Sequence, residues 1–192
     1  MLLIGAETLS HVVDYEDRSS CILFGDGAGA AVLSCEYDRG EILDTRLFSD
    51  GTRYDVIWVE AGGAAEPISH DAIEAKRHLM NIRGREVYKF AVARFVDLVS
   101  QQRQLCPELE LGMIVPHQVN LRIIESARNR LEIDPDRVYT NIDRYGNTSA
   151  ASIPIALDEL VRAGRMDDMK GKQVIFCAFG AGLTWASGSM RW

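Results

Sequence analysis

The sequence predicts an α/β fold in which a mixed, mostly parallel sheet carries helices on both faces. From residue 85 onward, apolar segments with helical spacing alternate with short apolar runs of strand length, which is typical of a parallel sheet. A short glycine-rich turn separates the last two runs and predicts an antiparallel edge. The chain has 192 residues, of which 47% are hydrophobic, so it is long and apolar enough to bury a core.

The first third of the chain is expected to contain short strands and loops. Apolar runs of strand length occur at residues 2–4, 21–24, 30–33 and, more weakly, 41–48 and 55–59. Residues 25–29 read GDGAG, whereas a dinucleotide-binding loop needs the spacing GxGxxG and a helix after it. A glycine turn between strands whose backbones approach closely explains this segment better. Residues 61–69 are expected to form an exposed loop.

The rest of the chain is expected to alternate helices and strands. Residues 85–105 place Val87, Phe90, Ala91 and Phe95 three or four positions apart, which predicts an amphipathic helix. Further helices are expected at residues 120–131 and 148–163. Strands are expected at residues 111–115, 138–141, 174–178 and 184–190, with residues 179–183 as the turn between the last two.

Charge and cysteine usage exclude several classes of function. The net charge is −7, because 28 acidic side chains outnumber 21 lysines and arginines, so binding to nucleic acid or to an anionic membrane is not expected. No apolar run approaches the roughly 20 residues that span a bilayer. Cys21, Cys35, Cys106 and Cys177 are scattered without a CxxC pair. We therefore expect no metal site, reduced thiols and a cytoplasmic location.

Two polar segments follow predicted strands and are candidates for a site. His117 comes two residues after the strand at 111–115, and Asn147 comes six residues after the one at 138–141. Ligands bind at the carboxyl ends of strands in such sheets, and both side chains could donate hydrogen bonds to one oxyanion. Each could equally cap or pack at the start of a helix. Residues 179–182 could present backbone N–H groups, although a simple hairpin turn is the favoured interpretation.

Five segments resemble β-ketoacyl-[acyl-carrier-protein] synthase III, a condensing enzyme of the thiolase superfamily, and they stand in the same order as in that family. The segments are FGDGAGAAV from residue 24, GREVYK from 84, VPHQVNLRI from 115, DRYGNTSAA from 143 and AFGAGLTW from 178. The resemblance implies a thiolase-like fold. Residues 1–40 would be the last strands of its amino-terminal half, and residues 41–192 would be its carboxy-terminal half.

The resemblance also implies an acyltransferase of fatty acid biosynthesis, which condenses acyl-coenzyme A with malonyl-acyl carrier protein and loses carbon dioxide. His117 and Asn147 would be catalytic and would hold the malonyl thioester oxygen. The other implied roles are the oxyanion and malonyl pocket for Phe179, Gly180 and Ala181, coenzyme A or pantetheine binding for Gly84, Tyr88 and Asn120, and docking of acyl carrier protein for Lys89 and Arg122. No cofactor is expected beyond the coenzyme A thioester that serves as substrate.

Two departures from the family pattern remove no named chemical function, although Arg85 could alter contacts to pantetheine, and a third departure is an absence. Arg85 stands where the family usually has Asn, and Ala181 replaces a glycine. The family's nucleophilic cysteine lies in a small-residue segment upstream of Met1, and none of the four cysteines here has that setting. We therefore expect a carboxy-terminal portion of the enzyme that is inactive alone. The apolar face of the helix at 148–163 predicts a homo-oligomer.

Two alternatives stay open at the level of sequence. The chain could be a non-catalytic module that binds acyl carrier protein or pantetheine. It could also belong to a ketide- or olefin-forming condensing enzyme that resembles synthase III but takes different acyl donors.

Overall fold

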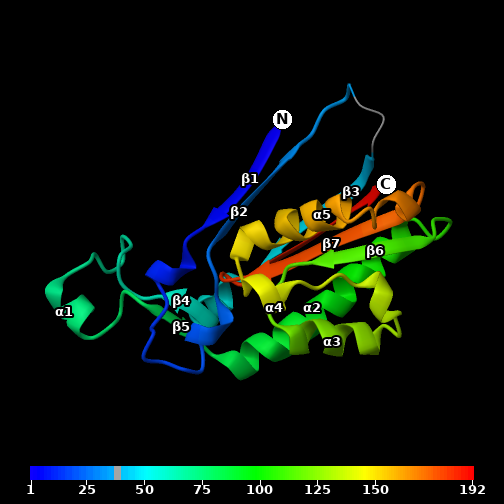
Figure 1. The fold of residues 1–192 in the computed structure, drawn as a ribbon. Helices are drawn as coiled ribbons and strands as arrows, with labels where there is room; N and C mark the ends of the chain where they lie inside the picture. The colour runs from blue at the N-terminus through cyan, green and yellow to red at the C-terminus, as the bar shows by residue number, and fades with distance from the viewer. Residues whose placement is uncertain (37–39) are drawn as a thin grey trace.

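A four-stranded sheet forms the centre of the chain in a computed structural model that describes residues 1–36 and 40–192. Its strands, in spatial order, are β3 (Glu41–Ser49), β8 (Thr184–Arg191), β7 (Gln173–Gly180) and β6 (Leu111–Pro116). Helices α2 (Gly84–Leu105) and α3 (Leu121–Arg130) cover one face, and α5 (Ser152–Arg162) covers the other (Figure 1). The prediction of an α/β fold with helices on both faces is therefore confirmed.

The prediction of a mostly parallel sheet was wrong. Among the described strands of this sheet, only β6 and β7 pair in parallel, whereas β7 with β8 and β8 with β3 are antiparallel. Residues 138–141, expected as a strand, contribute one parallel bridge between Ile114 and Val138 and then leave the sheet. On the other side of β7 the sheet continues with its hairpin partner β8 and then with β3.

The two faces of the sheet bury two separate apolar clusters. Side chains alternate along β6, so Ile114 faces α2 and α3 while Met113 and Val115 face α5. All three are completely buried, as is Phe95 of α2. The helix predicted from apolar spacing at residues 85–105 is confirmed, because that spacing brings one continuous stripe against the sheet.

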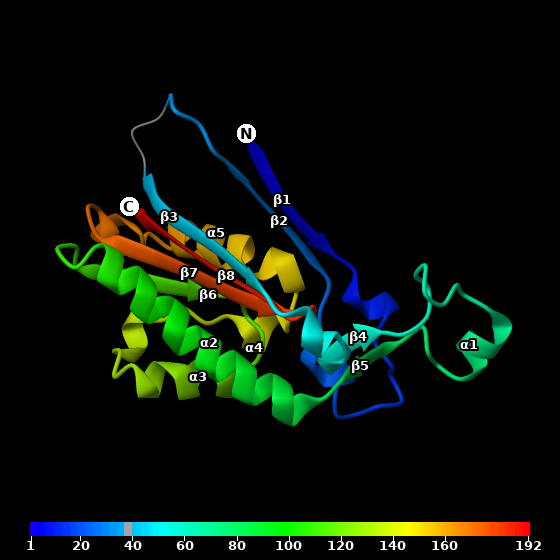
Figure 2. The ribbon, with the colours of Figure 1, turned by 180° about the vertical axis from the view of Figure 1, so that it is seen from behind.

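An antiparallel ribbon of β1 (Leu2–Glu7) and β2 (Gly27–Val32) packs against α5 (Figure 2). The glycines expected to form a turn at 25–29 lie partly inside β2, which corrects that prediction. A Cβ atom at Gly29 would lie 2.9 Å from Pro154 of α5, so the glycine permits the strand and the helix to approach. The close approach was expected, but it is made to a helix and not across a turn.

Residues 21–24 do not form the predicted strand. Cys21–Leu23 is a single 3₁₀ turn, in which the Leu23 N–H donates to Ser20 O over 3.0 Å. Local hydrogen bonds of this kind use backbone groups that a strand would offer to a neighbour. Phe24 then pairs with Asn147 in an isolated parallel bridge. This short contact joins the first part of the chain to the second candidate site segment.

Residues 60–79 extend away from the body of the molecule and return to it (Figures 1 and 2). The exposed loop expected at 61–69 is present, and the short α1 (His70–Glu74), which was not predicted, follows it. A small pair of strands, β4 (Ile57–Val59) and β5 (Met80–Ile82), closes the base of this excursion, after a 3₁₀ segment that replaces the first part of the strand expected at 55–59.

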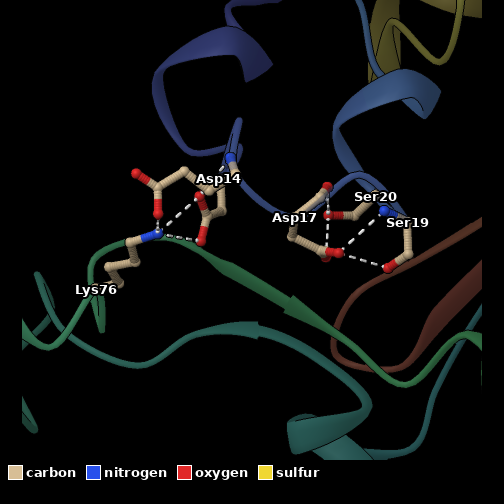
Figure 3. Close-up of polar contacts among 6 residues, drawn as sticks. Asp14, Asp17, Ser19, Ser20 and Lys76 are labelled. Atoms are coloured by element: carbon tan, nitrogen blue, oxygen red, sulfur yellow. Dashed lines mark hydrogen bonds and ion pairs between the residues drawn. The ribbon is translucent and has the colours of Figure 1, made fainter.

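An ion pair ties the returning end of the excursion to the loop after β1. The Lys76 ammonium lies 3.0 Å from Asp14 Oδ2 and 2.6 Å from Glu16 Oε2, and Figure 3 shows Lys76 pointing toward Asp14. In the same loop the Asp17 carboxylate accepts hydrogen bonds from the Ser19 and Ser20 hydroxyls at 2.7 and 2.6 Å (Figure 3). The loop is therefore held both from within and from the excursion.

The helix expected at residues 148–163 begins later than predicted. Ser149–Ala151 is a 3₁₀ turn, and the α-helix starts at Ser152. The short α4 (Ile142–Tyr145) precedes it and was not predicted, because four residues give no measurable apolar period. Of the helices in residues 1–36 and 40–192, none combines the length and apolar character that crossing a membrane requires.

Candidate active site

His117 is placed by the end of β6. Its backbone N–H donates to Cys177 O over 2.8 Å, which continues the pairing of β6 with β7 by one residue. The side chain is 8% exposed, and its Nδ1 lies 2.7 Å from Ser152 Oγ on α5. The Phe179 ring and the imidazole form a T-shaped pair, with 6.1 Å between ring centroids. The imidazole is thus held from two elements.

Asn147 is placed by the segment that precedes β2. Its backbone N–H donates to Leu23 O over 2.8 Å, and its carbonyl accepts from the Gly25 N–H over 3.0 Å. The side chain is 7% exposed, and Asn147 Oδ1 accepts from the Ser149 N–H over 2.9 Å. Gly146 has φ 68°, a conformation that glycine adopts without strain, and so turns the chain into this position.

Gln118 and Glu159 anchor the chain between His117 and Asn147. Gln118 is 1% exposed; its Nε2 donates to Tyr139 O over 3.1 Å, and its Oε1 accepts from the Asn141 N–H over 3.0 Å. From α5, the Glu159 carboxylate accepts from Asn141 Nδ2 over 2.6 Å and from the Tyr145 hydroxyl over 2.7 Å. These bonds fix the path that leads to Asn147.

A cavity of about 640 Å³ is lined by residues of β3, β7, β8 and the start of α5, together with His117 just after β6. It brings together His117, Phe179 and Gly180 of the predicted site. Asn147 and Ala181 are not in its lining, although Ser149 and Ala150, two and three residues after Asn147, are. The whole lining consists of Leu47, Phe48, Ser49, His117, Ser149, Ala150, Ser152, Ile153, Ala178, Phe179, Gly180, Thr184, Trp185 and Ala186. The convergence of His117 and Asn147 on one oxygen stays a prediction.

Several lining residues were not singled out from the sequence. Phe48 of β3 stacks on Trp185 of β8 with 5.7 Å between ring centroids, and both form one wall of the cavity. Their pairing depends on the register of two strands far apart in the chain, which no local pattern reveals. Ser152 had a weak signal, since it is a hydroxyl on an otherwise apolar helix face.

Burial determines the protonation state of His117. It lowers the pKa of His117 from 6.5 to about 4, so the imidazole is neutral near pH 7. Among the described residues, the one fully buried side-chain polar atom without a hydrogen-bond partner is His78 Nδ1. His117 Nε2 and Asn147 Nδ2 also have no hydrogen-bond partner among the described residues, but neither atom is fully buried. Both are therefore available to a ligand.

No cysteine of the described chain lines the cavity. Cys177 lies in β7 and is 1% exposed, and burial raises the pKa of its thiol, which disfavours the nucleophilic thiolate. Cys106 follows the far end of α2, Cys35 is exposed beyond β2, and Cys21 begins the 3₁₀ turn near Asn147. The lining of the cavity therefore includes the His117 imidazole but no thiol of the described residues.

The residues predicted to bind coenzyme A lie outside the cavity, at the first turns of α2 and α3. Gly84 begins α2, and the Tyr88 hydroxyl lies 2.7 Å from Ser126 Oγ, which joins the two helices. Asn120 caps α3, because its Oδ1 accepts from the Arg122 N–H over 2.9 Å.

The two residues predicted to dock acyl carrier protein lie in the same two helix starts. Lys89 of α2 and Arg122 of α3 are both exposed. Ala181, expected to offer a backbone N–H, is exposed in the turn between β7 and β8, and its carbonyl accepts from Thr184 Oγ1 over 3.0 Å. The roles of these residues stay predictions.

Two family models match most of the chain. Residues 102–192 match the model described as 3-oxoacyl-[acyl-carrier-protein (ACP)] synthase III C terminal, and residues 1–51 match the model described as 3-oxoacyl-[acyl-carrier-protein (ACP)] synthase III. The β-ketoacyl-[acyl-carrier-protein] synthase III of Caldanaerobacter subterraneus subsp. tengcongensis is 47% identical over the whole chain, and that of Clostridioides difficile is 44% identical. This chain spans 58% of the length of each.

Solved structures agree with these sequence matches. The synthase III of Thermus thermophilus superimposes with a TM-score of 0.85 at 40% identity, and the chain covers 58% of it. The Aquifex aeolicus enzyme superimposes with a TM-score of 0.84 at 38% identity, with 57% covered. The priming β-ketosynthase of the R1128 polyketide pathway is 34% identical, with a TM-score of 0.80. With its thiolase-like fold, the chain belongs to the 3-oxoacyl-[acyl-carrier-protein] synthase III family, and it spans a little over half the length of the members it matches.

Proposed function

We propose that this chain supplies the half of a synthase III site that decarboxylates a malonyl thioester and stabilises the resulting enolate. The observation that carries the proposal is a neutral, buried His117 in the wall of a cavity of about 640 Å³ that it shares with Phe179 and Gly180. A neutral imidazole and a carboxamide donate hydrogen bonds without a change of protonation. Both suit a substrate oxygen on which negative charge develops.

The proposed reaction begins when the bond between the malonyl α-carbon and its carboxylate breaks. Carbon dioxide leaves, and the electron pair is delocalised onto the thioester oxygen as an enolate. His117 and Asn147 would each donate a hydrogen bond to that oxygen. The enolate carbon would then attack an acyl thioester, form the new carbon–carbon bond and expel the thiolate that carried the acyl group. Removing one oxyanion donor of this type costs about 10²-fold to 10³-fold in rate.

The acylated nucleophile would come from outside these 192 residues. Supporting this, none of the four cysteines lies on the cavity in the described chain, and Cys177, next to it in β7, is buried as a thiol. The chain alone is thus proposed to be inactive in condensation, as an acyl acceptor is needed beside the oxyanion donors.

The proposed partners are acyl carrier protein and acyl-coenzyme A. Exposed cations at Lys89 and Arg122 suit an acidic carrier protein. The adjacent helix starts at Gly84 and Asn120 suit the phosphates of coenzyme A, since the positive ends of two helix dipoles lie there.

The decarboxylation is tested with malonyl-acyl carrier protein labelled at the free carboxyl group. The purified chain should release labelled carbon dioxide slowly, and His117→Ala and Asn147→Ala should each reduce the release about 10²-fold. His70→Ala removes a histidine from the exposed α1 and is the matched control, with no expected effect. Release that is unchanged in the His117 and Asn147 variants would overturn the proposal. Binding of the carrier protein without any release would favour a non-catalytic module.

The nucleophile is tested separately with labelled acyl-coenzyme A and mass spectrometry of each cysteine. We expect no stoichiometric acylation of Cys21, Cys35, Cys106 or Cys177 and no ketoacyl product. A polypeptide that corresponds to the part of the relatives not spanned by this chain should restore product formation. Acylation of one of the four cysteines followed by product formation would contradict the proposal.

A further inference from the structure

We propose that Ser152 is a positioning residue that fixes the tautomer of His117, so that the ring proton sits on Nε2, the nitrogen that is left open to the cavity. The inference rests on the proposed function, because it specifies how the same site presents a donor to the substrate oxygen. It uses a residue that the chemistry above does not require, and it can be tested without turnover.

Ser152 Oγ has two partners among the described residues. The residue begins α5 and is 2% exposed. Its Oγ lies 2.7 Å from His117 Nδ1 and 3.2 Å from the backbone nitrogen of Gln118. A backbone N–H can only donate, so Gln118 occupies one lone pair of the hydroxyl.

The direction of the remaining hydrogen bond follows from counting donors and acceptors. A hydroxyl has one proton to donate, and a buried hydroxyl loses stability if that proton has no acceptor. Within the described chain, the acceptor left for Ser152 is His117 Nδ1. A neutral imidazole that accepts at Nδ1 carries its proton at Nε2. The position of the hydroxyl therefore selects one of the two neutral tautomers.

The surroundings of the ring favour the neutral state, so the choice lies between tautomers. Within the described residues, the hydrogen-bond partner of the ring is the Ser152 hydroxyl and its aromatic neighbour is Phe179, and neither carries charge. No carboxylate of the described residues is hydrogen-bonded to it, which would otherwise favour an imidazolium. An Nε2–H group in this position can stabilise an enolate oxygen at once, without taking a proton from water.

The tautomer is measured directly by NMR on the whole chain labelled with ¹⁵N-histidine. The protonated and unprotonated ring nitrogens have well-separated ¹⁵N shifts, and their couplings to the ring protons assign each to Nδ1 or Nε2. We expect His117 to show a protonated Nε2 and a bare Nδ1 at pH 7. A protonated Nδ1 in the wild-type chain would overturn the proposal, whatever the decarboxylation assay shows.

Variants separate positioning from folding. Ser152→Ala removes the donor and should give a mixture of tautomers with a slower decarboxylation, whereas Ser152→Thr keeps a hydroxyl and should restore the Nε2–H form. Ser189→Ala is the matched control, because Ser189 is also 2% exposed but donates to Gln102 Oε1 on the other face of β8. An unchanged tautomer in folded Ser152→Ala would contradict the proposal. If that variant does not fold, the wild-type spectrum still decides.

Discussion

The His117 imidazole shows how burial alone can prepare a residue for catalysis. Desolvation lowers its pKa to about 4, and its hydrogen-bond partner is a neutral hydroxyl. The folded protein therefore keeps this ring neutral through a pH range in which an exposed histidine takes up a proton. The unfolded chain has no such restriction, so folding stability should depend on pH through this one residue.

The sign of this dependence follows from the lowered pKa. Between pH 7.5 and 5.5 the unfolded state binds a proton at residue 117 that the folded state does not, so the free energy of unfolding should fall by about 1.4 kcal/mol. The contribution is complete above the unfolded pKa of about 6.5 and is lost as the pH falls toward 4. Urea unfolding at the two pH values measures it. His117→Gln should lack this loss, while the control His70→Gln should keep it; an equal loss in all three proteins would contradict the assignment.

Among the elements, α5 contributes most to the site. Its first residue contacts His117, and two turns later Glu159 accepts hydrogen bonds from Tyr139, Asn141, Arg144 and Tyr145. Leu160 and Ala156 anchor the helix on the sheet and are completely buried. One helix thus holds the imidazole directly and the Asn147 segment through its carboxylate.

Glu159→Gln should loosen that segment. The substitution removes the negative charge that pairs with Arg144. It also replaces one acceptor oxygen with an NH₂ group, at a place where four donors already converge on the carboxylate. We expect the free energy of unfolding to fall by about 2 kcal/mol, as is usual for hydrogen bonds to a charged group, and the decarboxylation to slow because Asn147 is less well held. Asp158→Asn on the exposed side of the same helix, where Asp158 pairs with Arg162, is the control and should leave both unchanged. A Glu159 variant with wild-type stability and rate would refute this role.

For the whole molecule, exposed apolar surface lies on the β1–β2 ribbon. Leu2, Leu3, Ile4 and Val32 are each more than half exposed. The apolar face of α5 is buried at Ala156 and Leu160 against this ribbon and the sheet, while Val161 of the same face is 46% exposed. The ribbon is the larger physical basis for self-association, because its strands also present unpaired backbone groups at their edges.

We predict that the chain self-associates at micromolar concentration through this ribbon. Sedimentation velocity should show species heavier than 21.4 kDa. Ile4→Lys should shift the chain toward monomer by placing a charge in the apolar surface, whereas Ile73→Lys on the exposed α1 should not. A wild-type chain that sediments only as a monomer would contradict the prediction.

The sequence by itself determined the features that depend on local patterns. The spacing of apolar residues located α2, helix start and stop signals located α3, and runs of strand length located β6, β7 and β8. The segments around His117, Asn147 and Phe179 indicated the family and the candidate site. Such short runs of consecutive residues can be identified as motifs without knowledge of the fold. These inferences required no contact between distant parts of the chain.

Only the tertiary structure decided how those pieces meet. Whether residues 138–141 pair as a strand, and whether 21–24 do, depends on which neighbour lies beside them. Phe24 holds Asn147 across more than a hundred residues, and Ser152 reaches His117 from another element. Strand order and side-chain pairing are set by burial and hydrogen bonding summed over the whole chain, so a local pattern contains no information about them.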